Sequence, residues 1–172
     1  MKKYVWTFGL IAGTVLCINM IVMVNMMYNN PGFKGNDIAG YAGMVVVFSL
    51  TFFGTLNYRN KVLDGVISFG RAFKVAALIA LVGATMYVVA WLFYYYLFVP
   101  DFIDKYTEHM LSTCQNDPAL LDATSRQMAS LKEMYKNPLF VVLITYSEVL
   151  PVGLVVALIS ALVLKRKAKP GA

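Results

Sequence analysis

Glu148 is the residue whose type and position most clearly suggest chemistry, because it lies alone among apolar residues that are numerous enough to cross a membrane. An ionisable side chain inside a transmembrane segment is costly and commonly serves an ion, a proton or a ligand. Glu148 precedes Lys165 by 17 residues, about 25 Å along a helix. Counts of 16 to 18 residues from a flanking basic residue place Asn19, Tyr41 and Trp91 at a similar depth. We therefore expect a polar layer in which one of these three side chains donates a hydrogen bond to Glu148.

Three kinds of function are compatible with this polar layer. In the first, the layer is a structural clamp that sets the register of the helices. In the second, Glu148 binds a proton or a cation in a cavity that opens to the outer side. The third is catalysis within the membrane, but no second acid, serine–histidine pair or metal-ligand set accompanies Glu148. We therefore predict no catalytic residues and expect that the protein is not an enzyme.

A second group of ionisable residues is clustered further along the chain, at Asp101, Asp104, Glu108 and His109. The three carboxylates share one face of a helix, and oxygen ligands of this kind bind divalent cations weakly. A zinc site is not expected, because the chain has one histidine and no cysteine beside it. With Lys105 adjacent, we interpret the cluster as a solvated acidic face and predict no metal and no cofactor.

The composition indicates a membrane protein. Of its 172 residues, 59% are hydrophobic and 14% charged, whereas about 25% are charged in an average soluble domain. A soluble globular fold and a disordered chain are both excluded. A membrane-crossing helix needs roughly 20 apolar residues, and stretches nearly free of charge predict four such helices, at 5–28, 38–56, 75–99 and 139–164. We predict one all-α membrane domain over residues 1–172, a bundle of four transmembrane helices with a polar insert at 101–137 between the third and the fourth.

Lysine and arginine are divided unevenly between the two sides of these helices. Ten lie in the N-terminus, the second connection and the tail, namely Lys2, Lys3, Arg59, Lys61, Arg71, Lys74, Lys165, Arg166, Lys167 and Lys169. Five lie in the other connections, namely Lys34, Lys105, Arg126, Lys132 and Lys136. Because cytoplasmic flanks carry the excess, both termini are predicted to be cytoplasmic and the insert to be outside. The net charge of +6 is then a mark of membrane topology, and we expect the lipid bilayer, not nucleic acid, as the partner.

The insert at 101–137 is predicted to form a helical hairpin. Apolar side chains recur at helical spacing in both halves, at Phe102, Tyr106 and Met110 and then at Leu121, Thr124, Met128, Leu131 and Tyr135. Asp117-Pro118 is typical of a capped helix start, and Asn137-Pro138 marks the end of the second helix. About 37 residues are too few for a core of their own. The apolar stripes must therefore pack on each other, on the membrane or on a partner.

Small residues four apart mark helix faces that neighbouring helices can approach closely in lipid. Such pairs and triplets occur at Gly9 and Gly13, at Ala76, Ala80 and Ala84, and at Gly153, Ala157 and Ala161. We interpret them as packing faces within one bundle, and the alternative is a face that joins two copies of the chain.

Several segments, in order along nearly the whole chain, resemble a known bacterial family. They are Gly9-Leu-Ile-Ala-Gly13, Gly40-Tyr-Ala-Gly-Met44, Phe53-Gly-Thr-Leu-Asn-Tyr-Arg-Asn-Lys61, Gly65-Val-Ile-Ser-Phe-Gly-Arg-Ala-Phe-Lys74 and Glu148-Val-Leu-Pro-Val-Gly153. The family is domain of unknown function 4199, a group of small four-helix membrane proteins. The resemblance implies four spans in a bacterial inner membrane and no assigned activity.

Two functions follow from these observations as expectations. The first is a non-enzymatic accessory, scaffold or partner-binding protein that contacts a protein partner or a second copy through the 101–137 insert or the small-residue helix faces. The alternative is a small transporter or an ion or proton pathway that uses Glu148. A water-accessible cavity that reaches Glu148 would favour the alternative, whereas a dry and packed layer would disfavour it.

Overall fold

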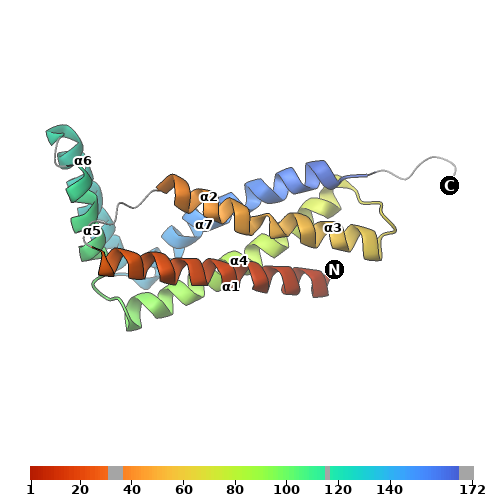
Figure 1. Ribbon diagram of the computed structural model, residues 1–172, viewed down its shortest axis with the longest axis horizontal. Coiled ribbons are helices and arrows are strands. Elements are labelled where there is room, and N and C mark those ends of the chain that lie inside the picture. The colour runs from red at the N-terminus through yellow and green to blue at the C-terminus, as the bar shows by residue number, and fades with distance from the viewer. Residues whose placement is uncertain (31–36, 115–116, 167–172) are drawn as a thin grey trace.

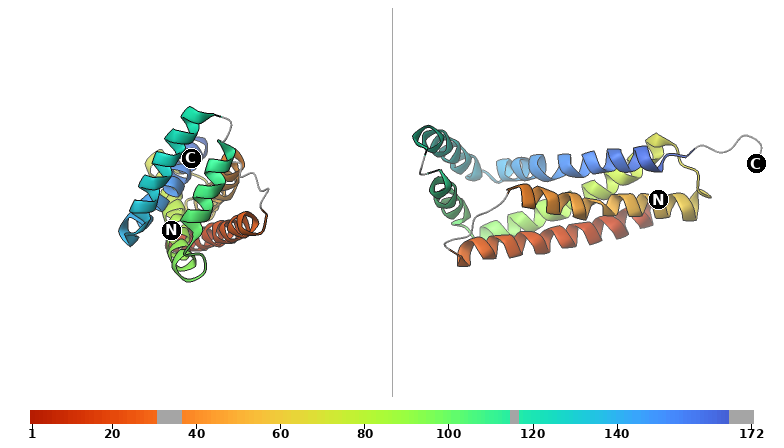
Figure 2. Two further views of the ribbon diagram at one scale, coloured as in Figure 1. Left: turned by 90° about the vertical axis from the view of Figure 1, so that its left-hand side faces the viewer. Right: turned by 45° about the horizontal axis from the view of Figure 1, so that its top comes forward.

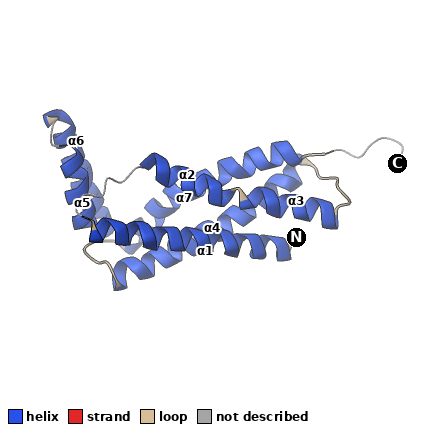
Figure 3. Cartoon of the chain, in the orientation of Figure 1, coloured by secondary structure: helices blue, strands red, loops and turns tan. Residues whose placement is uncertain are grey.

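The computed structural model describes residues 1–30, 37–114 and 117–166, and these form an all-helical bundle without strands (Figures 1 and 3). Its helices are α1 (Lys2–Asn29), α2 (Asp37–Phe48), α3 (Leu50–Val62), α4 (Phe69–Leu97), α5 (Phe102–Thr113), α6 (Pro118–Tyr135) and α7 (Pro138–Leu164). Three of the lysines counted above, Lys34, Lys167 and Lys169, lie outside the described residues.

The prediction of four apolar spans is confirmed. Among the described residues, the helices that are long and apolar enough to cross a membrane cover Lys2–Asn29, Gly40–Val62, Phe69–Leu97 and Pro138–Leu164. The third begins six residues before the predicted start at 75, because Ser68 caps it: the Ser68 hydroxyl accepts a hydrogen bond from the Arg71 backbone N–H at 3.4 Å.

The predicted second span is present as Gly40–Val62, and it consists of two helices separated by one residue. α2 ends at Phe48 and α3 begins at Leu50, with Ser49 between them. The Ser49 hydroxyl donates a hydrogen bond to the Val46 carbonyl at 2.6 Å. The Ser49 backbone keeps helical angles, φ −58° and ψ −19°, and its N–H donates to the Val45 carbonyl at 3.0 Å, so the span stays continuous. The span then continues to Val62, beyond the predicted end.

α4 is the central helix of the bundle, and α1 and α7 pack along it over most of its length. The contact to α1 is close because Gly9 and Gly13 face α4: a Cβ atom added at Gly9 would lie 2.7 Å from the Val82 Cβ. On α7, Gly153 is equally tight, since its added Cβ would lie 2.9 Å from Phe48 and 3.0 Å from Ala80. The predicted small-residue faces are therefore used for packing within the chain.

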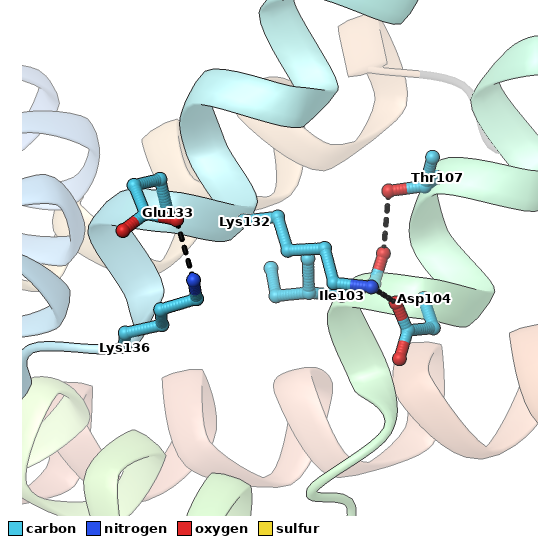
Figure 4. Close-up of polar contacts among 6 residues, drawn as sticks. All are labelled: Ile103, Asp104, Thr107, Lys132, Glu133 and Lys136. Carbon is cyan, nitrogen blue, oxygen red and sulfur yellow. Dashed lines mark hydrogen bonds and ion pairs between the residues drawn. The ribbon is translucent and has the colours of Figure 1, made fainter.

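α5 and α6 form a hairpin that lies across one end of the bundle, as the left view of Figure 2 shows. The predicted start of α6 is confirmed, because the Asp117 carboxylate accepts hydrogen bonds from the Ala119 and Leu120 backbone N–H groups and Pro118 occupies the first turn. An ion pair between Lys132 and Asp104 joins the two helices (Figure 4). Between them Cys114, Thr124 and Met128 are buried.

The opposite end of the bundle carries the N-terminus, the connection from α3 to α4 and the end of α7 (Figure 1), together with the lysines and arginines of these segments. The Arg71 guanidinium donates a hydrogen bond to the Tyr58 hydroxyl at 3.1 Å, and Arg59 donates to the Leu164 carbonyl at 3.2 Å. Backbone hydrogen bonds also join Ile67 and Arg166. The connection after α3 is thereby tied to the end of α7.

Candidate ligand cavity at the hairpin end

A cavity of about 380 Å³ lies where the hairpin meets the bundle. Its wall is built from six helices: α1, α2, α4 and α7 supply the sides, and α5 and α6 supply the cover. Four methionines contribute to it, Met20, Met23, Met44 and Met128. Five aromatic side chains contribute as well, Tyr87, Trp91, Phe102, Tyr106 and Tyr135. The site is therefore mostly apolar, with a few polar groups.

Glu148 is exposed and forms part of this wall, with Thr145 one turn earlier on α7. It is the one charged side chain among the described residues that line the cavity. The predicted hydrogen bond to Glu148 from Trp91, Tyr41 or Asn19 is not formed, and no other described side chain donates to its carboxylate. The carboxylate thus faces the cavity without a partner among the described residues.

Trp91 lies in the predicted layer but binds a different residue. Its side chain is 5% exposed, and its indole N–H donates a hydrogen bond to the Tyr135 hydroxyl. Phe102 packs edge-on against the indole with the ring centroids 4.8 Å apart. The hairpin supplies both contacts. The pairing with Glu148 was predicted from depth along a helix, and this depth gives no information about the hairpin.

Asn19 and Tyr41, the other two predicted members of the layer, are separated by the structure. Asn19 lines the cavity beside Glu148, and its amide nitrogen lies near Gly43 of α2. Tyr41 is 49% exposed and is not a wall residue, because α2 turns Gly40 and Met44 toward the cavity instead. Of the predicted set, the structure therefore brings Glu148, Trp91 and Asn19 to one cavity and leaves Tyr41 outside it.

The wall residues from the hairpin were not predicted as site residues. Phe102, Tyr106 and Tyr135 belong to the apolar stripes of the insert, which the sequence showed only as packing faces. Burial raises the pKa of the Tyr135 phenol to about 12, and the nearby Glu148 carboxylate adds to this effect. The Tyr135 hydroxyl is therefore neutral at physiological pH.

The acidic cluster on α5 is used for structural contacts. Asp104 pairs with Lys132 of α6, and Asp101 accepts a hydrogen bond from the Tyr28 hydroxyl at 2.8 Å. Within the described ranges, no three histidine, cysteine, aspartate or glutamate side chains gather closely enough to hold a metal ion.

Residues 7–166 match the model of a family described as "Protein of unknown function (DUF4199)". The chain belongs to this family. Membership agrees with the resemblance seen in the sequence and with the four apolar spans of the structure. The searches of curated proteins and of solved structures give no match. Membership in the DUF4199 family assigns no activity, and the cavity is the feature from which a function has to be inferred.

Proposed function

We propose that this DUF4199 protein is a non-enzymatic membrane protein that binds a small molecule in the cavity beside Glu148. The observation that carries the proposal is the cavity itself, which reaches Glu148 and has a volume of about 380 Å³. Small-molecule sites commonly span about 300–1,000 Å³ and combine an apolar wall with a few polar groups. This cavity has both properties.

Two observations favour ligand binding over the other expectations. A structural clamp needs a hydrogen-bonded Glu148, and no described side chain donates to it. An accessory or scaffold protein contacts its partner through free faces, but the small-residue faces of α1 and α7 pack inside the bundle, and Phe102, Tyr106 and Tyr135 of the hairpin line the cavity. These parts of the two features that were expected to bind a protein partner or a second copy are engaged within the chain.

Transport is an extension of this proposal. It requires a second conformation, because the bundle between the cavity and the basic end is tightly packed, with Ala76, Ile79 and Ala80 fully buried. Flux of protons or cations into vesicles that contain the protein, abolished by Glu148→Gln, would add transport to binding. Binding without flux would restrict the function to binding.

We also propose that the protein lies in a bacterial inner membrane with both termini in the cytoplasm. The support is that the described basic residues of the termini and of the second connection gather at the end opposite the hairpin, as expected for cytoplasmic flanks. A protease-sensitive tag at the C-terminus should be cut only after the cells are permeabilised. The same tag placed between α5 and α6 should be cut in intact cells, and the reverse pattern would contradict this orientation.

The sharpest test of the cavity uses two glycines. A Cβ atom added at either Gly40 or Gly70 meets nothing within 4 Å, but only Gly40 lines the cavity. Gly40→Leu should fill part of the cavity and weaken ligand binding at least fivefold, whereas Gly70→Leu should leave binding unchanged.

Three aromatic probes of similar size suit this measurement: benzyltrimethylammonium, its neutral isostere neopentylbenzene, and benzylsulfonate. The chain has two tryptophans, and Trp6→Phe leaves the emission of Trp91 in the cavity wall as the signal. The protein would be studied in lipid nanodiscs. If no probe binds in a way that Gly40→Leu weakens, the proposed function is wrong.

A further inference from the structure

We infer that the ligand of this cavity is a monovalent organic cation, in which an ammonium group is attached to an apolar group about the size of an aromatic ring. The inference rests on the proposed ligand-binding function and adds the chemical class of the ligand. It depends on three properties of the wall: its single charge, its aromatic rings and its methionines.

The charge of the wall selects a cation. Glu148 is the one charged group among the described wall residues, and no described lysine or arginine forms an ion pair with it. A carboxylate attracts an opposite charge and repels an anion. The neutral Tyr135 hydroxyl and the amides of Asn19 and Gln127 add no second charge. One carboxylate balances one positive charge, which indicates a monovalent ligand.

The aromatic rings favour an organic cation over a metal ion. Tyr87, Trp91, Phe102, Tyr106 and Tyr135 surround the same space as Glu148, and ring faces attract ammonium groups, most strongly where water is excluded. A divalent metal ion would need several oxygen ligands, whereas the described wall offers one carboxylate. Aromatic rings around one carboxylate suit a cation that also has an apolar surface.

The methionines indicate how the apolar part of the ligand is held. Met20 and Met23 come from α1, Met44 from α2 and Met128 from α6. Methionine side chains are flexible and polarisable, and they adapt to ligands of different shape. We therefore expect the site to accept a range of apolar bodies attached to the cationic centre and to discriminate mainly by charge.

The test compares benzyltrimethylammonium with neopentylbenzene, which has the same shape without the charge. In the full chain with Trp6→Phe, in nanodiscs, the cation should bind at least tenfold more tightly than the isostere, and benzylsulfonate should bind more weakly still. Glu148→Gln should remove most of this preference by weakening cation binding at least tenfold while leaving the isostere unchanged. The matched control is Glu133→Gln, which removes a carboxylate that pairs with Lys136 outside the cavity wall (Figure 4). This variant should change the binding of neither ligand.

A second variant tests the rings. Phe102→Leu keeps an apolar side chain in the wall but removes one aromatic face, and it should weaken cation binding by about twofold to fivefold with little effect on the isostere.

Nanodiscs of phosphatidylglycerol with and without phosphatidylethanolamine separate two sources of the ammonium group. Competition by phosphatidylethanolamine would identify a lipid headgroup, and unchanged binding would identify a free ligand.

The results distinguish the inference from the function on which it rests. Three results together would show that the cavity binds ligands but that the cationic class is wrong. The isostere would bind as tightly as the cation, Gly40→Leu would weaken the binding of both, and Glu148→Gln would change the binding of neither. If Gly40→Leu affects none of the probes, both the class and the proposed function are wrong.

Discussion

Trp91→Ala is expected to lower the free energy of unfolding by about 3–5 kcal/mol, the usual cost of truncating a large buried aromatic side chain. The indole is 5% exposed and contacts Phe102 edge-on, so its loss removes packing between α4 and the hairpin. The change also deprives the Tyr135 hydroxyl of its hydrogen bond. The hairpin should therefore loosen first, and proteolysis within α5 and α6 should become faster.

The unfolding midpoint in detergent, measured as a function of added dodecyl sulfate, gives the size of this effect. Trp6→Ala is the matched control, because the Trp6 side chain is 57% exposed and its truncation should change the midpoint little. Trp91→Phe keeps a ring but loses the N–H donor, and it should cost about 1–3 kcal/mol if the Tyr135 hydroxyl remains buried without a partner. Equal midpoints for Trp91→Ala and Trp6→Ala would show that the hairpin does not depend on this contact.

Gly9→Ala is expected to destabilise the bundle by about 1–3 kcal/mol, although it adds a single methyl group. That methyl group would lie 2.7 Å from the Cβ and Cγ1 atoms of Val82 and 3.2 Å from the Ile79 carbonyl oxygen. A Cβ atom and a backbone oxygen cannot rotate away, so α1 and α4 have to separate. The separation would loosen contacts along both helices, and α1 and α4 are one of the most extensively packed helix pairs in the structure.

Gly70→Ala is the control for this second prediction. Gly70 is also helical, but a Cβ atom there meets nothing within 4 Å, and alanine favours a helix over glycine by about 0.5–1 kcal/mol. Its unfolding midpoint should stay the same or rise. If Gly9→Ala were as stable as Gly70→Ala, the close approach of α1 to α4 would be refuted.

Much of the fold could be predicted from local patterns. Four stretches nearly free of charge predicted the four apolar spans, because lipid excludes exposed charges and an unpaired backbone over the thickness of its apolar core. Asp117-Pro118 predicted the start of α6, because the cap is formed by neighbours in sequence. The division of the second span into α2 and α3 at Ser49 was not predicted, since a lone serine continues many helices.

The candidate site was predicted only in part. Counting residues from the basic end predicted Glu148, Trp91 and Asn19 at one level, because the rise along a helix is constant, and the structure brings all three to the wall of one cavity. The same count gives no rotation about the helix axis, and α2 turns Tyr41 away from the cavity and Gly40 toward it. It also gives no information about the hairpin, whose Tyr135 takes the hydrogen bond of Trp91.

The sequence by itself determined that this protein is suited to lipid, how many apolar spans it has and that one acid lies within them. These properties depend on composition and on distance along the chain. Only the tertiary structure decided that the acid faces a cavity, because a cavity forms from side chains of six helices that lie far apart in sequence. Whether such helices leave space or fill it depends on their rotation and on the packing of glycines such as Gly9 and Gly153, which are properties of the assembled bundle.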